Sequence, residues 1–458
     1  MSGAQPHVVV IGGGFGGLAA AHELSRRNVQ VTVFEQDEAL GGLAGSFRVG
    51  GENLERFYHH WFTNDRHVLD LIHDLGADDQ VLLRHSRTGM YYANRFFRLS
   101  TPLDLLRFDA LPLVDRIRLG LLTLRARRVR DWRALESLSA GQWLRRLGGD
   151  AVYRVVWEPL LRGKFGPHAE DVSAVWFWNK LKLRGGSRGK GSAEMLAYYR
   201  GGFAALAERV AAGVVARGGR IRTGERVGRV FVENGRAAGV LLPTGVLRAD
   251  ALIATPPLPL IADLLPESAF DAGYLDSLRR IRYLANVCIV LQLDRSLSDS
   301  YWLNVNDPGF PFVGVIEHTN FEPVGTYGGR HIVYLSRYLP EADPLFQMSD
   351  GDALDYCLPY LARMFPAFRR EWVLDSHVWR ARHSQPIVER HYSRLIPDMR
   401  APLAGLYLAS MAQIYPEDRG TNYAIREGRR VAAAVADDLH ASRGRAVGTA
   451  EQTTVPGS

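Results

Sequence analysis

The 458-residue sequence predicts an α/β protein, in which a Rossmann-like dinucleotide-binding domain is interleaved with an α+β substrate domain. Three observations support this class. A glycine-rich turn separates an apolar strand from an Ala-rich helix near residue 12, and a strand–loop–helix pattern occupies residues 405–439. The residues between them contain an amphipathic helical stretch and several β-like apolar runs, which must form the second domain.

The first element is a nucleotide-binding turn. HVVVI at residues 7–11 predicts a strand, and GGGFGGL then opens a helix that continues through Leu24. Its glycines have the spacing G-x-G-x-x-G, which permits a tight turn, close approach of a pyrophosphate, and close helix–strand packing. The helix N-terminus supplies N–H groups and a positive dipole end for phosphates. The expected cofactor contacts of this turn are Gly12, Gly14, Phe15, Gly16 and Gly17.

An acidic residue closes the first nucleotide-binding unit. VQVTVFE alternates as a second strand that ends at Glu35, 18 residues after Gly17. A carboxylate in this position holds ribose hydroxyls, which favours adenosine with a free 2′-OH. Strand, turn, helix, strand and acid together predict a dinucleotide site.

A second glycine pair, Gly41 and Gly42, follows Glu35 in the stretch QDEALGGLAGSF. In this arrangement the chain resembles the amine oxidases, protoporphyrinogen oxidases, phytoene-type desaturases and UDP-galactopyranose mutases. The resemblance implies FAD as the cofactor, with Gly41, Gly42 and Leu43 against its pyrophosphate and ribityl chain. Many relatives have Arg where this chain has Leu43. The expected fold is then a Rossmann-like FAD-binding domain with an interleaved α+β substrate domain.

Two later segments resemble the same family. Residues 219–257 predict a three-stranded meander with a turn at Asn234-Gly235, and the resemblance implies that adenine is held beside Val227. Residues 405–439 predict a buried strand, a loop and a helix, and the resemblance aims the N-terminus of this helix at the isoalloxazine. The residues that would then meet the ring edge are Gly420, Thr421, Asn422 and Tyr423.

These segments divide the chain into nucleotide-binding and substrate parts. Apolar residues near 3.6-residue spacing predict a helical first insert, and runs such as ANVCIVLQLD and RHIVYLSRYL predict an antiparallel sheet in the second. The expected parts are 1–85, 200–260 and 395–440 for FAD binding, 86–199 for the helical cap, 261–394 for the sheet, and 441–458 for a disordered tail.

Composition and charge exclude several classes. The net charge of +7, from 56 basic and 49 acidic residues, is carried by dispersed Arg, which predicts no nucleic-acid partner. Two distant cysteines and no Cys/His cluster predict a reduced, cytoplasmic setting and no metal site. No apolar run reaches the roughly 18 residues of a membrane span. The Arg-rich stretch LRARRVRDWR leaves open a solvated surface helix or peripheral contact with the cytoplasmic face of a membrane.

Five residues are candidates for substrate chemistry. His59 and His60 in YHHWF follow the second glycine pair, where related flavoproteins reach the flavin face, although packing or surface roles stay open. Arg162 and Lys164 lie in a segment that resembles the substrate entrance of the family, and would bind an anionic group unless they are solvated charges. Tyr415 in YPEDRGTNY immediately precedes the segment expected at the ring.

The function that the resemblance implies is that of an FAD-dependent oxidoreductase of the protoporphyrinogen oxidase or desaturase type. It would transfer hydride from an apolar or amphipathic small-molecule substrate, lipid-like or anionic, to flavin N5, and dioxygen or a quinone would reoxidise the flavin. One alternative is a flavin-dependent non-redox isomerase resembling UDP-galactopyranose mutase and acting on a nucleotide-sugar. Another is an FAD-holding protein without turnover.

Overall fold

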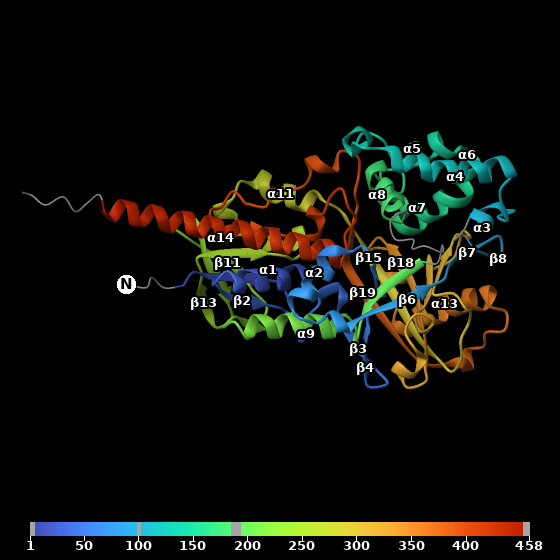
Figure 1. Ribbon diagram of the computed structural model, residues 1–458, viewed down its shortest axis with the longest axis horizontal. Coiled ribbons are helices and arrows are strands. Elements are labelled where there is room, and N and C mark those ends of the chain that lie inside the picture. Colours follow the sequence, from blue (N-terminus) through green and yellow to red (C-terminus); the bar gives the residue numbers. More distant parts are fainter. Residues whose placement is uncertain (1–4, 99–101, 185–193, 452–458) are drawn as a thin grey trace, which may run out of the picture.

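The computed structural model describes residues 5–98, 102–184 and 194–451. Figure 1 shows three regions: a Rossmann-like region around β1, α1 and α14, a large sheet around β15, β18 and β19, and a helical lobe of α4 to α8 above that sheet. The first is called the nucleotide-binding region after its predicted role. The first two regions combine segments that are far apart in the chain, whereas the helical lobe is one continuous stretch. The predicted fold class, a Rossmann-like domain interleaved with an α+β domain, is confirmed.

A five-stranded parallel sheet forms the centre of the nucleotide-binding region. Its strand order is β10-β2-β1-β14-β20, so that segments from both ends of the chain share one sheet. Alternate residues of β1 face opposite sides, with Val8 and Val10 in one core cluster and Val9 and Ile11 in another. The strands are β1 His7–Ile11, β2 Gln30–Phe34, β10 Arg220–Arg222, β14 Ala251–Ala254 and β20 Leu406–Leu408.

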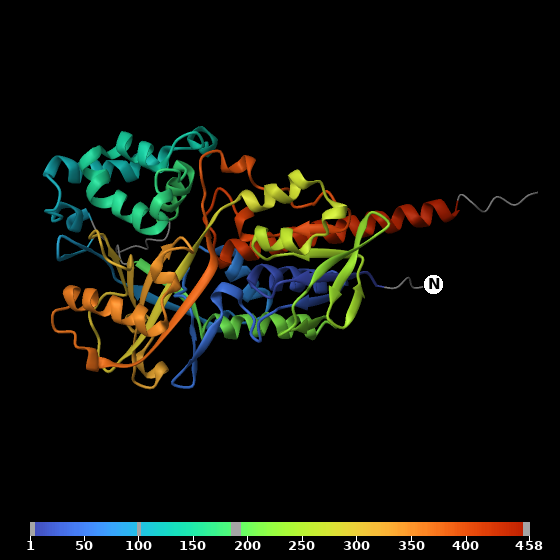
Figure 2. The ribbon, with the colours of Figure 1, turned by 180° about the vertical axis from the view of Figure 1, so that it is seen from behind.

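Helices cover one face of this sheet, and a small β-meander with two helices covers the other (Figure 2). A Cβ atom added at Gly428 would lie only 2.1 Å from the Gly16 carbonyl oxygen, so the first and last helices touch through their backbones. The covering helices are α1 Phe15–Arg26, α9 Gly202–Val215 and α14 Thr421–Glu451. The opposite face carries β11 Arg229–Glu233, β12 Arg236–Leu242, β13 Gly245–Arg248, α10 Leu258–Leu264 and α11 Ala272–Arg280.

Short strands connect the nucleotide-binding region to the large sheet. The hairpin β3–β4 follows the second glycine pair, and β5, β6 and β9 form a three-stranded sheet beside it. Buried Glu55, at the end of β4, accepts hydrogen bonds from Tyr198 Oη and Phe203 N at 2.7 Å each. The elements are β3 Ser46–Val49, β4 Glu52–Glu55, β5 Trp61–Phe62, α2 Arg66–Asp74, β6 Val81–Ser86 and β9 Glu194–Tyr199.

The seven-stranded sheet has the order β19-β15-β18-β17-β16-β7-β8 and is antiparallel except for the β16–β7 pair. Val287 and Ile289 of β15 face the cluster under α13, whereas Cys288 and Val290 face the nucleotide-binding region. This sheet therefore forms a roof over that region. Its elements are β7 Thr88–Tyr92, β8 Arg95–Arg98, β15 Tyr283–Leu293, β16 Trp302–Val305, β17 Gly314–Glu317, β18 His331–Leu339, α12 Pro344–Gln347, α13 Asp350–Met364 and β19 Val373–Pro386.

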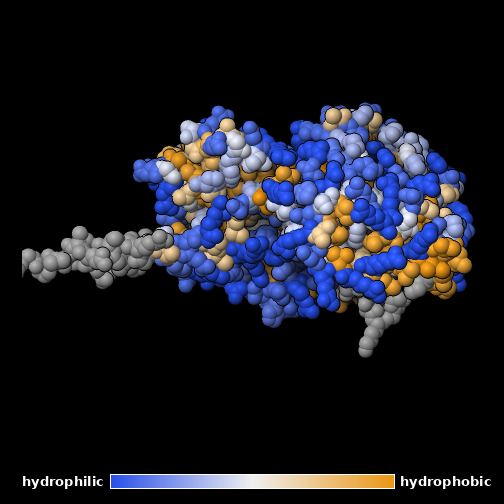
Figure 3. Space-filling view, turned by 90° about the horizontal axis from the view of Figure 1, so that it is seen from above, coloured by the Kyte–Doolittle hydropathy of each residue, from blue (hydrophilic) through white to orange (hydrophobic). Residues whose placement is uncertain are grey.

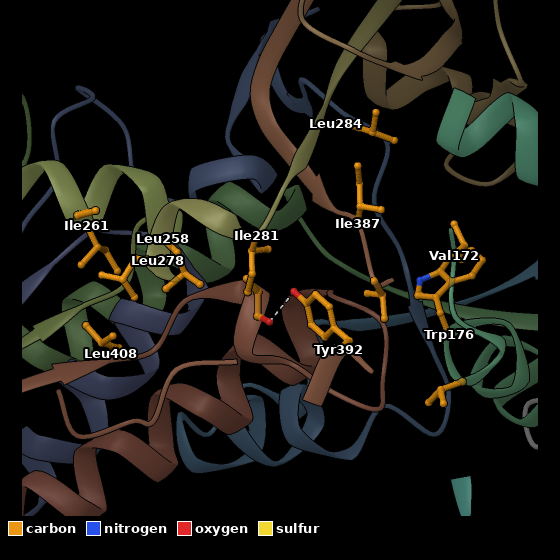
Figure 4. Packing of buried hydrophobic residues seen from close by; sticks show 14 of the residues in the cluster. Val172, Trp176, Leu258, Ile261, Leu278, Ile281, Leu284, Ile387, Tyr392 and Leu408 are labelled. Atoms are coloured by element: carbon orange, nitrogen blue, oxygen red, sulfur yellow. Dashed lines mark hydrogen bonds between the residues drawn. The ribbon is translucent and has the colours of Figure 1, made fainter. Parts of the chain in front are cut away.

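The helical lobe begins after β8. A capping box of Ser139 and Gln142 starts α5, and a π-helical turn over Tyr153–Trp157 separates α6 from α7. A continuous apolar cluster joins this lobe to the nucleotide-binding region, running from Leu408 past Tyr392 to Trp176 (Figure 4). The helices are α3 Pro102–Leu106, α4 Leu113–Arg128, α5 Ala140–Gly148, α6 Asp150–Val152, α7 Glu158–Phe165 and α8 Ala174–Arg184.

Two expectations about the substrate parts differ from the structure. The insert 86–199 is not purely helical, because β7 and β8 extend the large sheet and β9 pairs with β5 and β6. The tail expected from residue 441 is wrong as far as Glu451, since α14 continues to that residue. Ala and Arg favour helix strongly enough to offset the cost of the two glycines in ASRGRAVGTAE. Residues 452–458 lie outside the described residues.

Candidate active site

The N-terminus of α1 is built to hold an anion. The helix begins after Gly14, no side chain caps it, and its first turn contains no acidic residue. Its first backbone hydrogen bond runs from Leu18 N to Gly14 O at 2.9 Å, so among the described residues the N–H groups of the preceding turn have no helical acceptor. Free N–H groups and the helix dipole favour a phosphate at this end.

The two glycine segments lie against each other at this helix end. Gly41 N donates to Gly13 O at 3.0 Å, and a Cβ atom at Gly42 would lie 3.3 Å from Gly14 Cα. Gly12 has φ of +105°, and a Cβ atom at Gly17 would lie 2.0 Å from Gly12 O. Side chains would fill the space through which a pyrophosphate approaches the backbone, so the glycines fit a dinucleotide.

The expected ribose and adenine contacts also come together. Glu35 is buried, and its carboxylate accepts from Gly13 N at 2.7 Å and from Asp37 N at 3.0 Å. The backbone next to Val227 is tied to Glu35, because Glu225 N donates to Glu35 O at 2.9 Å. Val227 itself is buried at the start of the meander. A carboxylate and a backbone segment from distant parts of the sequence thus border the same cradle.

A cavity lies between the roof and the segment after the second glycine pair. It combines loop residues with one face of β15 and β18, where Asn286 is directly opposite Tyr338. Asn286 Nδ2 donates to Ser336 Oγ at 3.1 Å, while the buried Asn286 Oδ1 has no hydrogen-bond partner among the residues that the structure describes. The lining residues are Leu43, Phe57, Tyr58, His59, Asn286, Ser336, Tyr338, Ser384 and Arg419.

The two candidate histidines have different positions. His59 lines the cavity, and burial lowers its pKa to about 4. Its Nδ1 lies 2.5 Å from the Phe57 carbonyl oxygen, and because that oxygen can only accept, Nδ1 carries the proton and Nε2 is the acceptor. His60 lies outside the cavity lining and contacts Tyr301 Oη through Nδ1 at 2.9 Å. The structure therefore brings only His59 to the cavity.

The two candidate cations of α7 also separate. Arg162 is 60% exposed and pairs with Glu158 at 2.8 Å and with Glu170 at 3.8 Å. Lys164 lies 5.1 Å from the ring centroid of Tyr338, which lines the cavity, and 3.8 Å from Asp418. Lys164 therefore lies next to a cavity-lining residue, Tyr338, whereas Arg162 lies at the exposed surface.

Asp418 and Arg419 form a charged cluster next to the cavity. Asp418 is buried, contacts Lys180, and accepts from Trp176 Nε1 at 2.8 Å. Burial alone would raise the pKa of Asp418, but its neighbouring cations hold that pKa below the usual range. Arg419 donates from Nη2 to Tyr338 Oη at 2.7 Å and from Nε to Gln385 Oε1 at 3.2 Å.

The remaining expected contacts lie around the start of α14. Thr421 Oγ1 accepts from Trp61 Nε1 at 2.8 Å, and Asn422 Oδ1 accepts from Val68 N at 3.1 Å. The ring of Tyr423 packs against Arg426 at 5.0 Å, and no neighbour within 4 Å would obstruct a Cβ atom at Gly420. The side chains of Thr421 and Asn422 thus fasten α14 to the segment of residues 61–68.

Tyr415 is not a cavity residue. Its hydroxyl donates to Glu136 Oε1 at 2.8 Å, and its ring packs against Trp132 and Tyr392. The sequence arguments missed Asn286, Ser336 and Ser384, although a signal existed. Asn286 and Ser336 interrupt otherwise apolar strands, and a polar residue inside such a strand indicates either a paired polar group or a site.

Two features are absent from the part of the chain that the structure describes, a metal-ligand cluster and a membrane-spanning helix. In the described ranges 5–98, 102–184 and 194–451, no three His, Cys, Asp or Glu side chains are grouped as a metal would need. Within the same ranges, no helix combines the length and apolar character needed to cross a membrane.

Known proteins similar to this chain point to one family of flavoproteins. The chain is 30% identical over 178 residues to a coproporphyrinogen III oxidase from Propionibacterium freudenreichii, which covers 36% of this chain and 33% of that protein. It is 22% identical over 452 residues to a Synechococcus elongatus protein assigned as a zeta-carotene desaturase, covering 88% and 92%. The chain spans 33% to 41% of the length of the first curated relatives it matches.

Solved structures share the fold across nearly the whole chain. A protein from Exiguobacterium sp. 255-15 assigned as a protoporphyrinogen oxidase aligns with a TM-score of 0.75 at 19% identity, covering 95% of this chain and 99% of that one. A reduced UDP-galactopyranose mutase aligns with a TM-score of 0.75 at 15% identity, covering 94% and 95%. The family model described as flavin containing amine oxidoreductase matches residues 15–436. The chain therefore belongs to the flavin-containing amine oxidoreductase family.

Proposed function

We propose that the protein is an FAD-dependent oxidoreductase that takes hydride from a carbon or nitrogen centre of a small organic substrate. The observation that carries this proposal is the continuity of the site: the uncapped α1 N-terminus, buried Glu35 and the glycine loop of residues 41–42 lead toward the cavity beneath the roof. Bound FAD supplies the hydride acceptor, flavin N5, and dioxygen or a quinone is the proposed final acceptor.

The residues proposed to hold FAD are those that border the cradle and the start of α14. The α1 amides and the adjoining glycine loop would bind the pyrophosphate, Glu35 the ribose, and the backbone beside Val227 the adenine. The dipole at the start of α14 would favour negative charge at the ring edge. The full set is Gly12, Gly14, Phe15, Gly16, Gly17, Glu35, Gly41, Gly42, Leu43, Val227, Gly420, Thr421, Asn422 and Tyr423.

On the substrate side, we propose that the cavity side chains orient the substrate and that none of them acts as a nucleophile. His59 is neutral over the physiological pH range, so its role would be to accept a hydrogen bond through Nε2. Tyr58 stays protonated because burial raises its pKa well above the ordinary value. Lys164 and Arg419 supply positive charge beside the cavity.

We place FAD binding in residues 1–85, 200–260 and 395–440, and substrate binding in 86–199 and 261–394.

Relatives named as oxidases and desaturases support redox use of the flavin. The likeness to a UDP-galactopyranose mutase is one of fold alone at 15% identity, so a non-redox isomerase is not favoured. Anaerobic mixing of the purified protein with candidate substrates distinguishes redox from non-redox use of the flavin. We expect a substrate to bleach the oxidised flavin directly. Turnover of a nucleotide-sugar only after reduction by dithionite would contradict the proposal.

A second proposal concerns the surface of α3 and α4. Large apolar side chains gather toward the end of the molecule where the helical lobe lies (Figure 3). On α4 they recur at helical spacing, and exposed Arg107, Arg125, Arg128 and Arg130 lie nearby. We call these the α3–α4 face: Leu103, Leu106, Leu113, Val114, Ile117, Leu121 and Leu124.

We propose that the α3–α4 face makes peripheral contact with an anionic membrane, because apolar side chains flanked by Arg fit the headgroup region. Co-sedimentation with phosphatidylserine vesicles tests this contact. Exchange of Leu113, Ile117 and Leu124 for Ser is expected to lower the bound fraction at least fivefold. Exchange of exposed Leu83 and Leu374, which lie outside this face, serves as control. A cytoplasmic location stays a prediction.

A further inference from the structure

Among the described residues, the interior cation Arg419 donates hydrogen bonds to neutral groups only. Its guanidinium is held by two neutral acceptors, the Tyr338 hydroxyl and the Gln385 amide oxygen. Within the described residues, no Asp or Glu oxygen lies within 4.0 Å of it. Burial tends to lower the pKa of Arg419, but Tyr338 and Asp418 reverse that direction, so the group stays charged. An interior charge without a counter-ion is costly to the fold.

The neighbouring carboxylate of Asp418 attracts Arg419, but it is shared with two lysines. Asp418 Oδ2 contacts Lys180 and lies 3.8 Å from Lys164 Nζ. Its Oδ1 accepts from Trp176 Nε1 at 2.8 Å and from Gln385 Nε2 at 3.4 Å. The carboxylate of Asp65 also interacts with Lys180. The positive charge of Arg419 is therefore not neutralised by the cluster.

The cavity beside Arg419 has a second unused polar group. Asn286 is directly opposite Tyr338 in the roof, and Tyr338 is the residue that receives a hydrogen bond from Arg419. Asn286 Nδ2 is used by Ser336, but Asn286 Oδ1 is buried without a donor. A buried acceptor without a partner costs roughly 1–3 kcal/mol. The same cavity thus presents one cation and one acceptor that a ligand would satisfy together.

We propose that this cavity binds an organic anion that also carries a hydrogen-bond donor. Its acidic group, a carboxylate or a phosphate, lies against Arg419, and its hydroxyl or amine donates to Asn286 Oδ1. Arg419 is thus a specificity-determining residue, and the substrate class is acidic and polar instead of a hydrocarbon polyene. The inference rests on the proposed function, since it identifies the substrate of that site.

Isothermal titration of the purified holoenzyme with four probes tests the inference. Mandelate carries both groups, phenylacetate only the acid, mandelamide only the donor, and phenyl phosphate exchanges the acid type. We expect mandelate to bind at least tenfold more tightly than mandelamide, and several-fold more tightly than phenylacetate. The tighter of mandelate and phenyl phosphate identifies the kind of acid. Equal affinity for mandelate and mandelamide, or binding of neither, would overturn the inference.

Variants of Arg419 and Asn286 test whether these two residues cause the binding preferences. R419Q should abolish the preference for mandelate over mandelamide, and R419K, which keeps the charge without the planar fork, should keep part of it. N286L should remove the advantage of mandelate over phenylacetate. R382Q is the control, because Arg382 lies on β19 at 67% exposure and pairs with Glu341. If R419Q does not fold, the preference of R419K for mandelate over mandelamide decides whether Arg419 binds the acid.

The flavin spectrum separates two further outcomes. An R419Q protein that keeps the anion preference but loses flavin or shifts its visible spectrum would overturn the inference, because Arg419 would then position the cofactor. Calorimetry needs no flavin. A colourless protein that still prefers mandelate would therefore refute the proposed function and leave the anion site standing.

Discussion

The two halves of the candidate site, the cradle at the start of α1 and the cavity under the roof, are formed by different kinds of groups. The predicted nucleotide cradle consists mainly of backbone groups, the amides of one helix end and two glycine segments, with one buried side-chain carboxylate, Glu35. The cavity under the roof consists of side chains from the loop after the second glycine pair, from β15, β18 and β19, and from the segment before α14. Backbone sites depend on local geometry, whereas side-chain sites depend on the packing of distant elements. Changes in the two halves should therefore have different consequences.

The largest effect is expected in the cradle. In G17A the new methyl group would lie 2.0 Å from Gly12 O, so the turn must open or the helix must shift. We expect loss of bound flavin and a fall of about 3 kcal/mol or more in the free energy of unfolding. Urea unfolding and visible absorption measure both. G351A is the control because nothing lies within 4 Å of its Cβ, and a normal flavin content in G17A would show that the cradle tolerates a side chain.

The second-largest effect is the pH dependence of stability that buried His22 causes in the nucleotide-binding half. Burial lowers the pKa of His22 to about 4, and within the described part of the chain neither ring nitrogen has a hydrogen-bond partner. The unfolded chain binds more protons between pH 6.5 and 4, so the free energy of unfolding should fall as the pH is lowered through that window. The share of His22 is up to about 3 kcal/mol. Unfolding of wild type and H22L at pH 4.5 and 7 should show a smaller loss in H22L, and identical losses would refute this.

In the cavity half, D418N should leave Lys164 and Lys180 without their shared carboxylate. Both lysines are partly exposed, so we expect a loss of about 2 kcal/mol in the free energy of unfolding, below the cost for a fully buried pair. Flavin content should persist, because the cradle does not depend on this cluster. D355N is the control, since Asp355 and Arg370 form a solvent-exposed pair. Loss of flavin with unchanged stability would show that the two halves are not separable in this way.

The smallest effect distinguishes the two cations of α7. R162Q should change the free energy of unfolding by less than about 0.5 kcal/mol, because exposed ion pairs contribute little. K164Q should weaken binding of anionic probes several-fold, since Lys164 lies beside Tyr338 and Asp418. Titration of mandelate into both variants measures the contrast. A larger loss of mandelate affinity in R162Q than in K164Q would show that Arg162, and not Lys164, acts at the cavity.

Sequence patterns predicted the cradle far better than the cavity. The glycine spacing, the strand ending at Glu35 and the meander beside Val227 were all visible within short stretches. The structure places His59 in the cavity lining and Lys164 beside Tyr338, whereas His60, Arg162 and Tyr415 lie outside that lining. The roles of all five residues stay predictions. Neighbouring residues of one segment point in different directions, and only the packed elements decide which direction meets the site.

Local pattern was sufficient for the fold class and for the geometry of the glycine turn, because turns, helix starts and glycine contacts depend on residues close together in the chain. The cavity required the folded chain. Asn286, Tyr338 and Arg419 belong to three segments that meet only when the roof closes over the nucleotide-binding region. The charge balance around Arg419 was likewise decided there, since Asp418 is adjacent in sequence yet paired with lysines from α7 and α8.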